Sequence, residues 1–222
     1  MKKVLVCALS AIVLTAGVSS CGKTTKGKIS EDWNFTSLVG NSSSTSGGTT
    51  NSSSYSTTIS GSTITSTETS GGTTDTENGT VAKYVMSIKK DGTYEISSDV
   101  TWIDGSDSQQ EISTEKGTWS FVGKNKTDEF KKNERVIFNT TSENSTTTTK
   151  YNVGGSVVTN TTSGSDTYLV GQNSIIYTVV ESTGKKLVLE TEYNGTSSNT
   201  SGSGTVTSSA YSGKTTITLE KP

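Results

Sequence analysis

Apolar and polar residues alternate over much of the chain after residue 80, which is the pattern of β-strands with one buried face. Three apolar residues at alternate positions precede Asp91-Gly92, and two more follow it. An Asp-Gly pair between alternating runs predicts a hairpin with a type I′ turn, in which both central residues have positive φ. We therefore predict that five side chains share one buried face, namely Tyr84, Met86, Ile88, Tyr94 and Ile96.

Further runs of this kind predict the other strands. They cover residues 33–38, 112–122, 135–141, 168–180, 185–193 and 205–219. Thr183-Gly184 predicts a turn between two of the runs, and Ser212-Gly213 predicts a bend within the last. The whole set predicts an all-β fold, a single antiparallel up-and-down barrel of about eight to ten strands, because closure removes the exposed sheet edges.

The stretch 41–79 is nearly all Ser, Thr, Gly and Asn. Tyr55, Thr57 and Ile59 alternate within it, and Ile64 lies beyond Gly61. So few large apolar side chains bury little surface to offset the entropy cost of ordering the backbone. We expect this Ser/Thr-rich insertion to form one or two weak strands at a solvent edge.

The start of the chain has the order of a secretory signal peptide. Lys2 and Lys3 precede an apolar run, Val4–Val18, which is shorter than the ~20 residues of a membrane-spanning helix. Val18-Ser19-Ser20-Cys21 resembles the lipobox of bacterial lipoproteins. The resemblance implies that residues 1–20 are removed and that Cys21 receives a diacylglycerol thioether and an amine-linked acyl chain such as palmitate. Residues 21–30 then form the lipid anchor and a polar tether, and the alternative is a plain secreted or membrane-spanning protein.

Composition modifies this picture in two ways. The hydrophobic fraction is 28%, while Ser and Thr together exceed a third of the chain, so the core is thin. Pro occurs once and β-branched residues are abundant, which favours half-buried strands over disorder. The two cysteines are Cys7, in the signal peptide, and Cys21, so we expect no disulfide in the mature domain.

Charge and residue types exclude several functions. The formal net charge is −2 and no basic patch is present, which argues against a nucleic-acid partner. The chain has no His, which excludes His-dependent triads and zinc sites. Two sets of carboxylates are candidates for other chemistry. Asp104, Asp107 and Glu111 lack the spacing of a Ca²⁺-binding loop. Nothing in the sequence marks Glu95, Asp99, Glu181 and Glu190 as the paired acids of a glycosidase. We predict no enzyme activity, no cofactor and no metal.

Several segments resemble the lipocalin-like (calycin-type) lipoproteins of Gram-negative bacteria. They are Trp33, the hairpin 90–94, Gly117-Thr118-Trp119 and the late hairpin 176–189. The resemblance covers residues 31–222 and implies a small barrel with a hydrophobic interior. By analogy with such lipoproteins, Gly22 after Cys21 permits sorting to the outer membrane, where the domain faces either the periplasm or the outside.

Aromatic residues are the candidate ligand contacts. We expect them either to line a lumen that takes a small apolar ligand or to fill the core: Tyr84, Trp102, Trp119, Phe138 and Tyr177. The sequence therefore predicts a lipid-anchored protein that binds a small apolar ligand or serves an envelope-structural role. The alternative is a surface or adhesive module whose Ser/Thr-rich loops contact protein or glycan.

Overall fold

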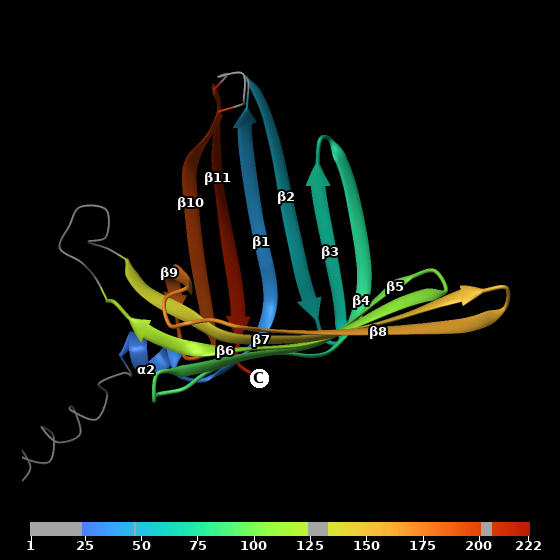
Figure 1. Cartoon of the computed structure of the whole chain (residues 1–222). Coiled ribbons are helices and arrows are strands. Elements are labelled where there is room, and N and C mark those ends of the chain that lie inside the picture. The colour runs from blue at the N-terminus through green and yellow to red at the C-terminus, as the bar shows by residue number, and fades with distance from the viewer. Residues whose placement is uncertain (1–23, 47, 124–132, 201–205) are drawn as a thin grey trace, which may run out of the picture.

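The computed structural model describes residues 24–46, 48–123, 133–200 and 206–222, which form one short helix and eleven strands (Figure 1). The helix α2 spans Thr25–Ile29. The strands are β1 (Asp32–Ser46), β2 (Thr49–Ser60), β3 (Thr63–Ser70), β4 (Thr73–Ile88), β5 (Thr93–Asp104), β6 (Asp107–Phe121), β7 (Glu134–Val153), β8 (Ser156–Thr167), β9 (Asn173–Ser182), β10 (Lys186–Thr200) and β11 (Val206–Glu220).

Ten of these strands close into an antiparallel barrel, as the sequence predicts. The strand order is β6-β5-β4-β3-β2-β1-β11-β10-β9-β7, and β6 pairs with β7 to complete the circle. Strand β8 is the eleventh and pairs with the outer half of β7. Most neighbours in the barrel are neighbours in sequence, so the topology is an up-and-down meander.

Most of the strands are much longer than the apolar runs that predict them. In β1 the inward positions change from Trp33 and Phe35 to Gly40 and Ser42, and in β10 they change from Leu187 and Leu189 to Thr191. The apolar ends meet and pack at the base of the barrel. The hydroxyl-rich ends cannot form a dry core, and beyond the base the wall separates into two arms.

Figure 1 shows these arms diverging from the base. The upright arm contains the outer halves of β10, β11, β1 and β2, together with β3 and the first half of β4. The lateral arm contains the outer parts of β5, β6 and β7, together with β8. Cross-strand hydroxyl pairs join the strands of both arms, such as Ser42 with Ser53 at 2.8 Å and Thr146 with Ser163 at 3.0 Å. Backbone ladders and hydroxyl pairs thus replace apolar packing in the arms.

The core at the base contains the residues predicted around Asp91-Gly92. Met86 pairs with Ile96, and Ile88 pairs with Tyr94. Met86, Ile88 and Tyr94 are buried, while Tyr84 and Ile96 are half-buried against the same cluster. The predicted common face of these five side chains is confirmed.

The turn itself differs from the type I′ prediction. Among the described residues positive φ occurs only at glycines, so Asp91 has negative φ and Gly92 alone has positive φ, at 89°. The Gly92 N–H donates to the Lys89 carbonyl at 3.2 Å, and the Asp91 carboxylate accepts from the Thr93 N–H at 2.9 Å and the Thr93 hydroxyl at 2.7 Å. These last two bonds lower the pKa of Asp91 and hold it in the turn, so Gly92 takes the left-handed conformation after it.

The second half of the expected tether is folded. Helix α2 begins after Thr24, whose hydroxyl accepts from the Gly27 N–H, and it ends at Ile29, which is fully buried. The Trp33 indole N–H donates to the Ile29 carbonyl at 2.9 Å. Residues 25–30 therefore belong to the domain, because Ile29 contributes to the core. In the described part of the chain, no helix has the length and apolar character needed to cross a bilayer.

The expectation of weak edge strands in 41–79 is wrong. β2 pairs with β1 and with β3 along its length, and β3 pairs in turn with β4. At the base β1 and β4 pair directly, for example at Trp33 and Met86. The hairpin β2–β3 thus enters the wall between two strands that otherwise adjoin, and its polar residues find partners on both sides.

The predicted bend at Ser212-Gly213 is also wrong, because β11 continues through it without a break. A Cβ atom at Gly213 would lie 2.4 Å from the Tyr193 ring. The glycine therefore provides room for a ring on the neighbouring strand rather than a change of direction. The predicted strand 168–180 begins only at Asn173, after a turn in which Leu169 and Val170 are exposed.

Candidate functional site

A cavity of about 240 Å³ lies directly above the core, where the two arms meet. We call it the mouth cavity. Its apolar wall consists of Phe35, Leu38, Ile59, Ile64, Tyr84, Val100 and Trp102. Its polar positions are Ser37, Thr57, Ser98, Glu111 and Ser113. The cavity is therefore a mainly apolar recess with a polar side.

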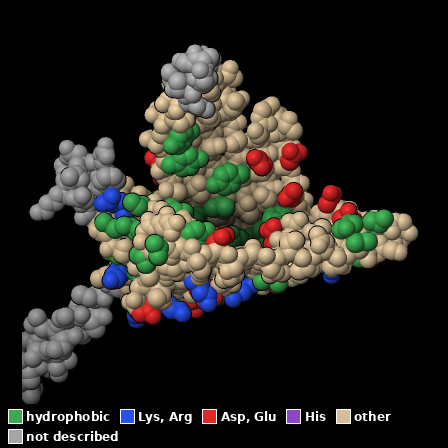
Figure 2. Space-filling view, viewed as in Figure 1, with side chains coloured by type: hydrophobic (Ala, Val, Ile, Leu, Met, Phe, Trp, Pro, Cys, Tyr) green, Lys and Arg blue, Asp and Glu red, His purple; other side chains and the backbone are tan. Residues whose placement is uncertain are grey.

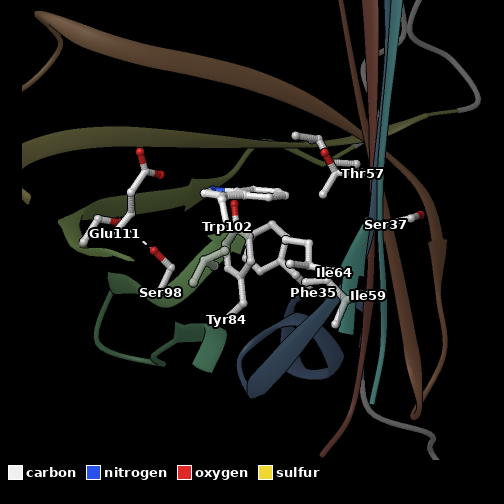
Figure 3. Close-up of a pocket in the computed structure, with 12 residues that line it drawn as sticks. Phe35, Ser37, Thr57, Ile59, Ile64, Tyr84, Ser98, Trp102 and Glu111 are labelled. Carbon is white, nitrogen blue, oxygen red and sulfur yellow. Dashed lines mark hydrogen bonds between the residues drawn. The ribbon is translucent and has the colours of Figure 1, made fainter. Parts of the chain in front are cut away.

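Figure 3 shows how this lining is arranged. Trp102 and Tyr84 lie between Glu111 and Ser98 on one side and the aliphatic residues Ile59 and Ile64 on the other. Alternation along β5 points Ser98, Val100 and Trp102 inward, and alternation along β6 does the same for Glu111. One end of the cavity is thus aliphatic and the other carries a carboxylate.

Tyr84 is held firmly in this wall. Its ring stacks on Phe35 with centroids 4.2 Å apart and an interplanar angle of 28°. Burial raises the pKa of the Tyr84 hydroxyl, and the nearby charges of Glu115 and Glu111 raise it further. The neutral phenol is therefore the form present in the cavity.

The structure divides the five aromatic residues predicted as ligand contacts. Tyr84 and Trp102 line the mouth cavity. Trp119 and Phe138 are buried in the core, and Tyr177 packs against it. Phe138 makes edge-to-face contacts with Tyr94 at 4.9 Å and with Tyr177 at 5.9 Å. For these three residues the structure favours core packing, the second of the two roles that the sequence allows.

Trp119 closes the base rather than lining a cavity. Its indole N–H donates to the Lys89 carbonyl at 2.7 Å, and its backbone N–H donates to the Gly92 carbonyl at 2.8 Å. The Lys26 ammonium of α2 lies 5.9 Å from the ring centroid. Trp119 thus joins the turn between β4 and β5 to helix α2.

A second, wider cavity of about 660 Å³ adjoins the first, between β4 and the lateral arm. We call it the acidic cavity, because it is lined by Asp75, Glu77, Asp104, Asp107 and Glu111. Trp102 and Glu111 line both cavities. Among the described residues, no group of three or more acidic or other metal-ligating side chains has the geometry to hold a metal ion.

A buried polar cluster lies beside the mouth cavity. The Tyr94 hydroxyl donates to the Glu115 carboxylate. The Thr140 hydroxyl also donates to Glu115, at 2.9 Å, and lies 2.9 Å from the Tyr94 hydroxyl. Burial and the bond to Glu115 raise the pKa of Tyr94. This cluster satisfies the polar groups at the boundary between core and arm.

The four carboxylates that are candidates for glycosidase acids have partners outside the two cavities. Glu95 pairs with Lys116, Glu181 with Lys186 and Glu190 with Lys214. Asp99 accepts a hydrogen bond from the Gln110 amide at 2.8 Å. None of the four lines the mouth cavity or the acidic cavity.

Sequence reasoning missed a set of tyrosines on the upright arm. Each lies across a glycine of the neighbouring strand, in the pairs Tyr55–Gly40, Tyr193–Gly213 and Tyr211–Gly195. A Cβ atom at any of these glycines would lie 2.3 to 2.4 Å from the ring. The signal that would find them is a glycine opposite a tyrosine, which requires knowledge of the register. Glu111 was missed as a cavity residue for the same reason.

In comparisons with known proteins, no family model, curated protein or solved structure matches this chain.

Proposed function

We propose that this protein is a lipid-anchored, non-enzymatic binding protein that takes the apolar group of a small ligand into the mouth cavity. The observation that carries the proposal is the mouth cavity itself, a mainly apolar recess above a filled core with Trp102 as one wall. Ligand sites are usually concave, apolar and furnished with a few polar groups. The seven apolar and five polar lining residues named above fit that description.

The size of the recess limits the ligand. Its volume, about 240 Å³, is below the ~300–1,000 Å³ of most drug-sized ligand sites. An aromatic ring or a short branched chain fits, whereas a long acyl chain does not, because the core below is filled by Trp119, Phe138 and their neighbours. The remainder of the ligand lies in the open angle between the arms.

The position of α2 supports an orientation on the membrane. The helix packs at the base, where Ile29 is buried and Lys26 lies over Trp119. A lipid on Cys21, which is outside the described residues, places this end toward the bilayer. The mouth cavity then opens away from the membrane, and we keep the outer membrane as the proposed location.

The proposal assigns no reaction to the site. The chain has no His, and among the described residues Glu111 is the single carboxylate that lines the mouth cavity. General acid–base work on a glycosidic bond needs two carboxyl groups placed on either side of it.

The test is calorimetric titration of the purified domain with 2-phenylethanol, a neutral probe with one aromatic ring. We expect saturable binding that Trp102→Ala abolishes. The matched control is Tyr193→Ala, which removes an aromatic ring outside the mouth cavity and leaves binding unchanged. Saturable binding that survives in Trp102→Ala would place the ligand elsewhere and refute the proposal.

The tyrosines of the upright arm favour a second candidate, a surface module that contacts glycans. Tyr193 and Tyr211 are 48% and 44% exposed, and with surrounding serines they line a shallow recess of about 380 Å³. Flat aromatic rings amid hydroxyl groups suit the apolar faces and hydroxyls of sugars. Binding of neutral oligosaccharides that is lost in Tyr211→Ala and kept in Trp102→Ala would support this candidate, and no binding would exclude it.

A further inference from the structure

Acidic side chains gather on the facing sides of the two arms, which we call the angle, and basic side chains lie on other surfaces of the molecule. Five carboxylates line the acidic cavity, and three more, Glu115, Glu143 and Asp166, line a recess of about 250 Å³ on the lateral arm. No Lys or Arg lines the mouth cavity or either of these two recesses, as far as the described residues go.

The basic residues lie on other surfaces. Lys116 and Lys214 point outward and pair with Glu95 and Glu190, and Lys221 pairs with Glu31 at the base. Figure 2 shows the same division: acidic side chains gather on the facing sides of the angle, and the basic ones follow the base and the underside of the lateral arm. In the described parts of the chain, no Lys or Arg thus lines these recesses to neutralise the carboxylates of the angle.

The carboxylates of the angle create a negative potential, which extends into the mouth cavity. Glu111 lines it, and the charges of Glu111 and Glu115 both act on the Tyr84 hydroxyl in its wall. A cleft with low-dielectric walls and charges of one sign concentrates ions of the opposite sign. An anionic ligand is disfavoured here, and a cationic one is attracted.

The two cavities adjoin at Trp102 and Glu111, which line both. A ligand whose apolar group occupies the mouth cavity therefore places its next few atoms beside these two side chains. A positive charge at that position meets the Glu111 carboxylate and can lie near the Trp102 indole, which also attracts cations.

We propose that the ligand is a small organic amine, in which an apolar group is joined to a positively charged nitrogen. This inference rests on the proposed function and adds the charge of the ligand to it. An organic cation fits better than a bare metal ion, because the carboxylates are spread along a wall instead of converging as metal ligands.

The experiment compares three probes that share a phenyl ring and differ in charge: 2-phenylethylamine, 2-phenylethanol and phenylacetate. We expect the amine to bind about tenfold more tightly than the alcohol, since an ion pair and a cation–π contact each add a few-fold. Phenylacetate should not bind. Raising the salt concentration should reduce the advantage of the amine.

The variant Glu111→Gln keeps the shape of the side chain and removes its charge. It should bring the affinity of the amine close to that of the alcohol, because the ion pair is lost. The matched control is Glu192→Gln, which removes a charge at an exposed site that pairs with Lys214 outside the angle and should change nothing. Glu77→Gln, in the acidic cavity, provides a second test if Glu111→Gln does not fold.

The outcomes separate the two proposals. If the alcohol binds as tightly as the amine, or phenylacetate binds most tightly, the inference about charge is wrong and the apolar site stands. Amine binding to both Glu111→Gln and Glu77→Gln that is as tight as to the wild type also overturns it. If none of the three probes binds, the proposed function fails and the inference fails with it.

Discussion

Replacing Trp119 by alanine tests the division between core and cavity that the functional argument requires. Trp119 is 5% exposed and belongs to the core cluster at the base. Loss of a buried tryptophan side chain in favour of alanine typically costs about 3–5 kcal/mol of unfolding free energy. The hydrogen bond from its indole N–H to the Lys89 carbonyl adds roughly 0.5–1.5 kcal/mol.

These values predict that Trp119→Ala lowers the unfolding free energy by about 4 kcal/mol or more, a large part of the ~5–15 kcal/mol of an ordinary domain. Trp119→Phe keeps much of the packing and loses the hydrogen bond, so about 1–2 kcal/mol is expected. Trp102→Ala should cost less than Trp119→Ala, because Trp102 is half-buried and lines an open cavity.

The assay is urea unfolding followed by far-ultraviolet circular dichroism, with the midpoint and slope fitted for all three variants. An unchanged slope shows that the variants lose stability without a change in the surface exposed on unfolding. A cost below about 1 kcal/mol for Trp119→Ala, or an equal cost for Trp102→Ala, would refute the placement of these two residues.

Three further predictions address packing, pH and anchoring. Gly117→Ala should cost about 1–3 kcal/mol by urea unfolding, because its Cβ would lie 2.0 Å from the Asn139 carbonyl oxygen, whereas Gly184→Ala, with open space around it, should cost little. Burial raises the pKa of Tyr177 to about 12, so the folded state favours its neutral form. The unfolding free energy should be constant below about pH 10 and fall as the pH rises from 10 to 12. An unfolding free energy that does not change across that range would contradict the burial of Tyr177. Cys21→Ser should move the protein from the detergent phase to the aqueous phase or leave it uncleaved, and identical partitioning of wild type and variant would exclude a lipid on Cys21.

The apolar half of each strand could be predicted from the sequence alone. Alternation around Asp91-Gly92 and Thr183-Gly184 predicts two hairpins that the structure contains, with Met86, Ile88 and Leu187 buried. A half-buried strand has apolar side chains on one face. Alternation of apolar and polar residues in the sequence therefore predicts such a strand directly. The all-β barrel follows from the same pattern.

The polar half of the strands was decided by the tertiary structure. Stretch 41–79 has little apolar alternation, so nothing local marks it as paired on both sides, and its strands are fixed by ladders to β1 and β4. The tertiary structure also decides which aromatic residues line the mouth cavity and which belong to the core. Trp102 and Trp119 both lie at inward positions of strands. They differ in their distance from the base, so Trp102 lines the mouth cavity and Trp119 packs in the core.

What the sequence determined by itself is therefore the all-β class and the set of apolar residues that turn inward around the core. The position of each inward residue along the barrel depends on register, and register is a relation between segments far apart in the chain, such as the pairing of Leu38 with both Thr57 and Ile217. That relation separates the two arms beyond the base, brings Glu111 next to Trp102, and collects the carboxylates on the inner side of the angle.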